Sequence, residues 1–118
     1  CFNKIKFLNI YLILIGNGHN DFLHYTNKNI ILLDHQDNVE DFYNIFDAYI
    51  SASRWETFGI SLVEAMSFNL PIITTIHEGN NEWINEYPVS TFLIDDIEEL
   101  KKKVEYLYKI KAKKKNII

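Results

Sequence analysis

Apolar residues gather in five short runs along the chain, and longer polar or mixed stretches separate them. Each run is continuous rather than alternating, which is typical of strands covered on both faces of a parallel sheet. The predicted strands are residues 10–15, 30–33, 48–51, 72–75 and 91–94. The stretches between and after them predict helices over residues 21–26, 39–46, 58–68, 82–85 and 97–110. The last of these has its apolar residues on one face, so we expect an amphipathic helix that closes the domain.

This alternation of strands and helices predicts an α/β fold, namely a doubly wound, Rossmann-like parallel sheet in a three-layer αβα arrangement. The chain has 118 residues, the size of one domain, so residues 1–118 are interpreted as a single domain. In such folds ligands bind at the carboxyl ends of the strands, where loops lead into helices. The loops in which a site is expected are therefore residues 16–20, 34–38, 52–58 and 76–81.

No apolar run reaches the roughly 18–20 residues that a membrane helix needs, so we expect a cytoplasmic protein that does not span a membrane. The single cysteine, Cys1, excludes an intramolecular disulfide and a cysteine-based zinc site, and it fits a reducing compartment. The first residue is this cysteine rather than a methionine, which indicates a piece of a longer protein.

The charge is unevenly distributed along the chain. Residues 1–100 carry a net charge of −11, whereas the last eighteen residues hold eight lysines and one glutamate. The acidic body argues against a nucleic-acid-binding protein. It also implies that an anionic ligand is held by backbone dipoles or by charges outside this chain. The lysine-rich end has two interpretations: a solvated helix face with a frayed tail, or a surface attracted to anionic lipids.

Residues 51–66 carry the most informative pattern. A strand ends near Ser51, a loop carries Glu56, and a helix begins near Phe58 and includes Glu64. Apolar residues cover most directions around this helix, so we expect it to be buried and Glu64 to be a carboxylate in a largely buried element. A second interpretation stays open, in which Glu64 reaches solvent through a gap in the packing and Glu56 is an ordinary loop acid.

The spacing of Glu56 and Glu64, with Phe58-Gly59 at the helix start, resembles the E-x7-E motif of the retaining glycosyltransferase family 4 (group 1). Further matches occur in the right order: a strand with a G-x-G turn at residues 14–18, a strand–helix–strand unit at 29–50, a strand preceded by Leu-Pro at 70–73, and a glycine loop at 77–82. The ordered set covers residues 12–84, which is most of the chain.

This resemblance implies the C-terminal, donor-binding half of an enzyme with the GT-B fold, built from two Rossmann-like domains. Such an enzyme transfers a sugar from a nucleotide diphosphate sugar to an acceptor hydroxyl with retention of configuration. The acceptor, a lipid-linked or surface glycan, would bind the N-terminal domain, which this chain lacks. Family members that build lipid-linked glycans work at the cytosolic face of the membrane, so peripheral contact through the lysine-rich end is one expectation.

The resemblance also implies roles for individual residues. Glu56 would face the transferred sugar as the catalytic carboxylate, and Glu64 would bind the ribose hydroxyls. His35 lies in a loop that in the family meets the nucleotide base. The free N–H groups and the positive dipole end of a helix make an anion site without a basic side chain. The backbone that would lie against the diphosphate and sugar belongs to Thr57, Phe58, Gly59 and Ile60.

Departures from the family pattern lead to further expectations. Asn69 stands where the family has a glycine after the helix, and asparagine can adopt the same left-handed conformation. Glu78 replaces the first glycine of the glycine loop, which affects the expected sugar contacts. The basic pair that neutralises the diphosphate in the family would precede residue 12, and Lys4 and Lys6 do not match it. We therefore expect the 118-residue chain alone to be inactive as a transferase.

Other chemistries are disfavoured by what the chain lacks. It contains no Asp-x-Asp motif, so metal-independent chemistry without a cofactor is expected. The four histidines have no metal-ligand spacing, and His19, His24 and His77 are interpreted as solvated loop residues. A phosphoacceptor receiver domain would need an aspartate at the end of the third strand, where Ser51 stands. The alternative that stays open is a non-catalytic module that binds sugar nucleotides.

Overall fold

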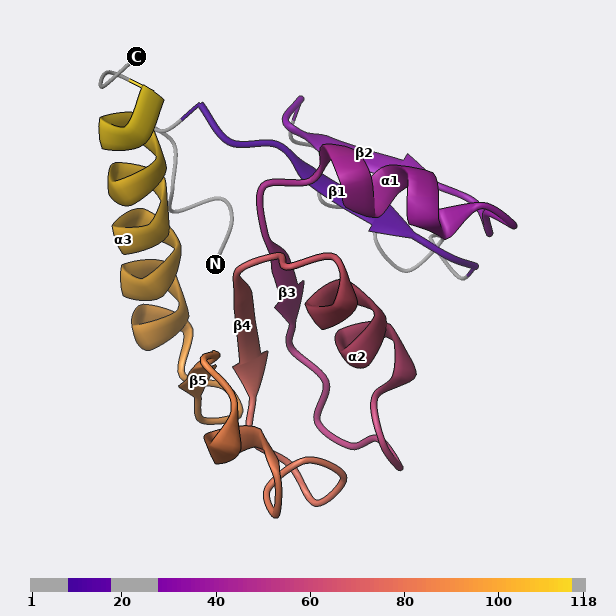
Figure 1. The fold of residues 1–118 in the computed structure, drawn as a ribbon, viewed down its shortest axis with the longest axis vertical. Helices are drawn as coiled ribbons and strands as arrows, with labels where there is room; N and C mark the ends of the chain where they lie inside the picture. The colour runs from indigo at the N-terminus through magenta and orange to yellow at the C-terminus, as the bar shows by residue number, and fades with distance from the viewer. Residues whose placement is uncertain (1–8, 18–27, 116–118) are drawn as a thin grey trace.

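The computed structural model describes residues 9–17 and 28–115 (Figure 1). Its elements confirm an α/β fold in which strands and helices largely alternate. The strands are β1 (Leu12–Ile15), β2 (Ile30–Leu33), β3 (Tyr49–Ser51), β4 (Ile72–Thr75) and β5 (Ser90–Phe92). The helices are α1 (Val39–Ile45), α2 (Ile60–Ser67), the 3₁₀ helix η3 (Ile84–Glu86) and α3 (Ile97–Lys115). The helix predicted at residues 21–26 lies outside the described residues.

All strand pairs are parallel, as the continuous apolar runs predict. β1 pairs with β2, with Leu12 opposite Ile30. A second sheet has the order β3-β4-β5, and β4 is its central strand. All four residues of β4 are buried, which explains why this strand is apolar without alternation.

The sheet β3-β4-β5 is the middle of three layers. The neighbouring residues Ile72 and Ile73 of β4 point to opposite faces, because side chains alternate along a strand. Ile72 belongs to a core cluster with Leu62 and Ala65 of α2, whereas Ile73 packs with Val104 of α3. Figure 1 shows α2 and α3 on either side of this sheet. The three-layer αβα prediction therefore holds for these three strands.

The described strands form two parallel sheets rather than one, within the Rossmann-like α/β arrangement that the pattern predicts. β1 and β2 make a separate two-stranded unit, and none of their residues is fully buried. A continuous apolar run indicates a strand but does not specify its neighbour, since pairing depends on contacts between residues far apart in the sequence. The pattern therefore identified β1 and β2 correctly without determining which sheet they join.

The predicted boundaries differ from the observed ones mainly at the ends of elements. α2 begins at Ile60 rather than at residue 58, because Gly59 adopts a left-handed conformation that a helix does not contain. α3 continues to Lys115, five residues beyond the prediction. Lysine and alanine dominate this extension, and both have high helix propensity.

The end of α2 follows the prediction for Asn69. This residue has a φ of 55°, in the left-handed region, and its N–H donates to the carbonyl of Met66. The N–H of Leu70 donates to the carbonyl of Ala65, which completes a Schellman motif. The helix therefore ends as it would with glycine, and the chain turns directly into β4.

Candidate functional site

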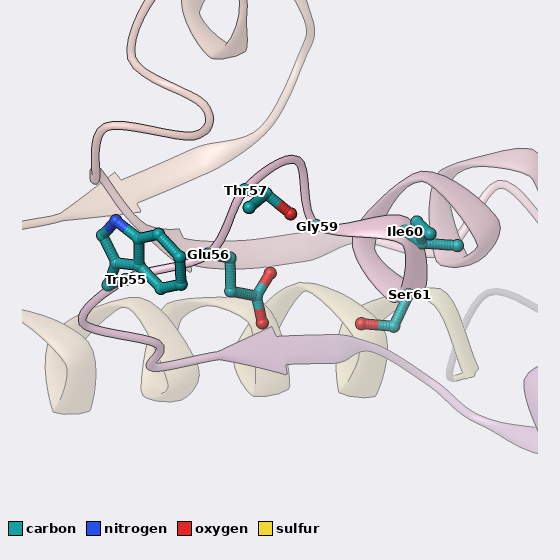
Figure 2. A pocket seen from close by; sticks show the side chains of 6 residues that line it. All are labelled: Trp55, Glu56, Thr57, Gly59, Ile60 and Ser61. Carbon is teal, nitrogen blue, oxygen red and sulfur yellow. The ribbon is translucent and has the colours of Figure 1, made fainter.

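The loop between β3 and α2 forms an open pocket of about 390 Å³ (Figure 2). It lies beyond the carboxyl end of β3, in one of the loops where the parallel-strand pattern predicts a ligand site. Three of its residues are among the predicted donor contacts and one is the predicted catalytic carboxylate. The lining residues are Trp55, Glu56, Thr57, Gly59, Ile60 and Ser61.

The carboxylate of Glu56 is held by a chain of hydrogen bonds from the sheet. The Ser53 hydroxyl donates to Oε1 of Glu56 at 2.8 Å. The carbonyl of Ser53 in turn accepts a hydrogen bond from the buried Thr75 hydroxyl at 2.6 Å. Figure 2 shows the Glu56 side chain directed into the space beneath the loop, on the side where Ser61 lies. The end of β4 thereby fixes the loop that presents the Glu56 side chain.

Gly79 packs against the backbone of the same loop, and this close contact is possible because glycine has no side chain. A Cβ at this position would overlap the carbonyl oxygen of Glu56 and would lie 2.8 Å from that of Thr57. The glycine loop after β4 therefore packs directly against the backbone of the pocket. This contact gives a physical reason for glycine here despite the unusual Glu78 before it.

The start of α2 presents unpaired backbone N–H groups to the pocket. Gly59 precedes the helix with a φ of 82°, and its carbonyl accepts from the N–H groups of Leu62 and Val63. Within the described part of the chain, the N–H groups of Ile60 and Ser61 have no hydrogen-bond partner. Free N–H groups and the helix dipole make this end of α2 attractive to an anion.

Thr57 and Phe58 lie in the loop rather than in the helix. The side chains of both are exposed, and the Phe58 ring packs on Trp83 with 5.6 Å between the ring centroids. Trp83 in turn donates its indole N–H to the carbonyl of Gly79. The aromatic contact therefore links the loop before α2 to the glycine loop.

Glu64 is exposed, so the prediction of a carboxylate in a buried helix is wrong. α2 buries only one side, through Leu62 and Ala65, whereas Ile60 on its outer side is 71% exposed. The physical reason is that no described element covers α2 at Ile60. Glu64 lies one helical turn after Ile60 on the same side of α2, and therefore next to the pocket.

Two tyrosines, Tyr43 of α1 and Tyr49 of β3, make hydrogen bonds to residues of α2. The Tyr43 hydroxyl lies 3.3 Å from both Oε2 of Glu64 and the carbonyl of Ser61. Burial, followed by the negative charge of Glu64, raises the pKa of Tyr43 to about 12. The hydroxyls of Tyr49 and Ser61 are 2.7 Å apart, and burial raises the pKa of Tyr49. Both tyrosines are therefore neutral hydrogen-bonding groups at ordinary pH.

His77 is buried, which corrects its interpretation as a solvated loop residue. Its ring Nδ1 accepts the N–H of Gly79 at 3.2 Å, and the Asn80 amide lies 3.2 Å from Nε2. The Asn80 side chain also accepts the backbone N–H of His77 and donates to the carbonyl of Thr75. Burial is tolerated because these polar groups satisfy one another.

His77 and Asn80 thus shape the turn that brings Gly79 against the Glu56 loop, and neither was among the predicted site residues. The signal that indicates them is positional. Both lie within five residues of the end of β4, the strand with the most completely buried sequence, so a polar side chain there must find a hydrogen-bond partner or destabilise the fold.

The structure does not bring His35 to this pocket. Its side chain is 70% exposed in the loop after β2, where Nε2 lies 3.5 Å from the Asp37 carboxylate. Contact with a nucleotide base therefore stays a prediction. Lys4, Lys6, His19 and His24 lie outside the described residues.

Within residues 9–17 and 28–115, no group of three or more His, Cys, Asp or Glu side chains is placed so that it could hold a metal ion. Across the same residues, none of the helices combines the length and apolar character that crossing a bilayer requires. Independence from metal stays a prediction.

Comparison with known proteins identifies the family. Residues 2–118 match the family described as glycosyl transferases group 1. The chain is 29% identical over 76 residues to the lipopolysaccharide core biosynthesis mannosyltransferase LpsB of Rhizobium meliloti, covering 64% of this chain and 22% of the relative. It is 31% identical over 78 residues to the capsular polysaccharide biosynthesis glycosyltransferase CapM of Staphylococcus aureus, covering 59% and 20%.

A third relative is the uncharacterized glycosyltransferase MJ1059 of Methanocaldococcus jannaschii, at 34% identity over 77 residues, covering 59% of this chain and 19% of the relative. The alignments thus span about a fifth of the length of these relatives. The family match, in contrast, extends over nearly the whole chain. The chain therefore belongs to the group 1 glycosyltransferases.

Proposed function

We propose that this chain is the donor-binding part of a glycosyltransferase that uses a nucleotide diphosphate sugar and retains the configuration of the transferred sugar. One observation carries the proposal: the fixed Glu56 carboxylate and the unpaired N–H groups of Ile60 and Ser61 border the same pocket. A carboxylate suits a sugar with developing positive charge, and the helix start suits a diphosphate.

The donor would lie along the outer side of α2. Its diphosphate meets the N–H groups at the helix start, and its ribose reaches Glu64 one turn further, about 5 Å along the axis. Both oxygens of a carboxylate can accept hydrogen bonds, so Glu64 can bind two ribose hydroxyls at once. The exposure of Glu64 leaves it accessible to such a ligand.

In the proposed reaction the bond between the sugar carbon and the diphosphate oxygen breaks, and the oxygen of an acceptor hydroxyl forms a new bond on the same face of the sugar. The hydroxyl proton passes to the departing diphosphate. Glu56 stabilises the positive charge that develops on the sugar ring. The N–H groups of α2 stabilise the negative charge on the departing diphosphate, without a metal ion. The complete enzyme adds a basic pair and the domain that binds the acceptor.

The acceptor class follows from the relatives. LpsB is named for lipopolysaccharide core biosynthesis and CapM for capsular polysaccharide biosynthesis. We therefore propose a glycan or glycolipid of the cell surface as the acceptor.

The experiment replaces Gly59 by valine in the complete protein. The new Cβ would lie 3.0 Å from Oε2 of Glu56, at a φ that valine rarely adopts, so the backbone at the helix start must shift. We expect UDP and GDP to bind much more weakly by calorimetry, whereas uridine and guanosine, which lack the phosphates, lose little affinity.

The matched control is Thr57→Val, which removes a hydroxyl from the same loop but keeps the backbone N–H groups in place. It should preserve the preference for the diphosphates. If Gly59→Val weakens nucleosides and nucleoside diphosphates by the same factor while the circular dichroism spectrum is unchanged, the diphosphate does not bind at this helix end.

A further inference from the structure

The outer face of α3 carries a line of exposed residues, Lys102, Tyr106, Lys109 and Lys113, which we call the outer stripe. Their spacing of four, three and four residues places them on one side of a helix over a length of about 16 Å. The Tyr106 side chain is 68% exposed. α3 lies along the outer edge of the molecule in Figure 1, so the stripe is open to a large partner.

The other lysines of α3 whose side chains the structure describes have acidic partners. Lys101 lies 3.9 Å from Glu105, and Lys103 lies 3.4 Å from Glu99. Lys111 reaches across to Asp47 at 3.1 Å. In contrast, the three lysines of the outer stripe have no ion-pair partner within residues 9–17 and 28–115. Positive charge is therefore neutralised on the sides of α3 and left uncompensated along the stripe.

The helix that carries the stripe is anchored by its opposite face. Val104 is buried against Ile73 and Phe92, and Leu100 and Leu107 pack around them. The stripe is therefore presented by a helix fixed to the sheet. The pocket beside α2 lies on the other face of the same sheet, so a partner on the stripe does not cover the pocket.

The helix dipole does not account for the stripe. The dipole favours lysines only in the last turn of a helix. Lys102 is the sixth residue of α3, and it lies closer to the amino-terminal end. The dipole therefore does not explain the position of Lys102 in the stripe.

We propose that the outer stripe of α3 binds an anionic lipid surface. Three unpaired lysines in a straight line match a flat array of negative headgroups, and an exposed tyrosine suits the interfacial layer. Residues 1–100 carry a net charge of −11, and salt screens the repulsion between this acidic body and the surface at distances beyond about 8 Å. That same acidic body disfavours a nucleic acid as the partner. This inference does not depend on the proposed transferase activity.

The experiment measures co-sedimentation of the 118-residue chain with phosphatidylcholine vesicles that contain or lack 30% phosphatidylglycerol, at 0.15 M salt. We expect binding to the anionic vesicles only, and release at 0.5 M salt. The variant K102Q/K109Q/K113Q should bind about a hundredfold more weakly, since each lysine near such a surface contributes about fivefold. These residues are exposed, so the fold should be unchanged by circular dichroism.

The matched control is K101Q/K103Q/K111Q, which removes the same number of charges from the sides of the same helix. Its affinity for the anionic vesicles should stay about tenfold or more above that of the stripe variant. Equal losses in the two variants would overturn the proposal, since net charge alone would then explain binding. Equal binding to neutral vesicles, no binding to anionic ones, or tighter binding to single-stranded RNA than to anionic vesicles would also overturn it.

Discussion

Gly79→Ala tests whether the glycine loop positions the carboxylate of Glu56. The backbone of Gly79 has no positive φ, so alanine meets no conformational strain there. Its only difficulty is space, because the new Cβ would overlap the Glu56 carbonyl oxygen and lie 2.8 Å from that of Thr57. Both neighbours are backbone atoms, which cannot rotate away as the end of a flexible side chain can.

The size of the effect follows from these contacts. Ordinary contact with a Cβ begins near 3.4 Å, so the Thr57 oxygen must move by at least about 0.6 Å and the Glu56 oxygen by more. Inserting a methylene into a close-packed site costs about 1–3 kcal/mol of unfolding free energy. For a domain of this size that corresponds to a melting temperature lower by roughly 4–12 °C.

Thermal unfolding of the 118-residue chain by circular dichroism measures this loss, and calorimetry with UDP and GDP in the complete protein measures donor binding. Gly16→Ala is the control, since no atom lies within 4 Å of its Cβ and only its φ of 141° opposes the change. A melting temperature within about 1 °C of the parent for Gly79→Ala, with unchanged donor binding, would refute the argument that Gly79 positions the loop.

Three further predictions concern α2 and its supports. Glu64→Gln should lower donor-nucleotide affinity by about 10- to 100-fold in the complete protein, because charge-assisted hydrogen bonds are worth about 1.5–3 kcal/mol; an equal loss of melting temperature would make Glu64 structural instead. The pKa of Tyr43 is raised, so its neutral form stabilises the fold below pH 10, and this contribution declines as the pH rises towards 12. Between neutral pH and pH 11, the free energy of unfolding of the parent, measured in urea, should therefore fall by about 1 kcal/mol more than that of Tyr43→Phe. Asn69→Ala should lower the free energy of unfolding by about 1 kcal/mol because of the left-handed φ, whereas Asn69→Gly should not. Equal unfolding free energies for the two variants would argue against a strained cap.

The local pattern of the sequence determined the described strands, the helices α1, α2 and α3, and the loop that forms the pocket. A continuous apolar run is driven out of water by its own side chains, and this holds whichever element packs against it in the fold. The family resemblance, in which Asn69 stands where a glycine is usual, predicted the left-handed conformation that this residue adopts. The sequence pattern placed Glu56 in the loop before a helix and Glu64 within that helix, and the structure has both residues there.

Tertiary structure alone decided the neighbours of each element. The apolar runs of β1 and β2 do not encode their separation from β3-β4-β5, since strand pairing depends on distant parts of the chain. The burial of His77 depends on Asn80 closing a turn around it, and the exposure of Glu64 depends on which side of α2 meets the sheet. Burial is a property of the surroundings, so a pattern along one helix could predict its apolar side but not whether another element would cover the rest.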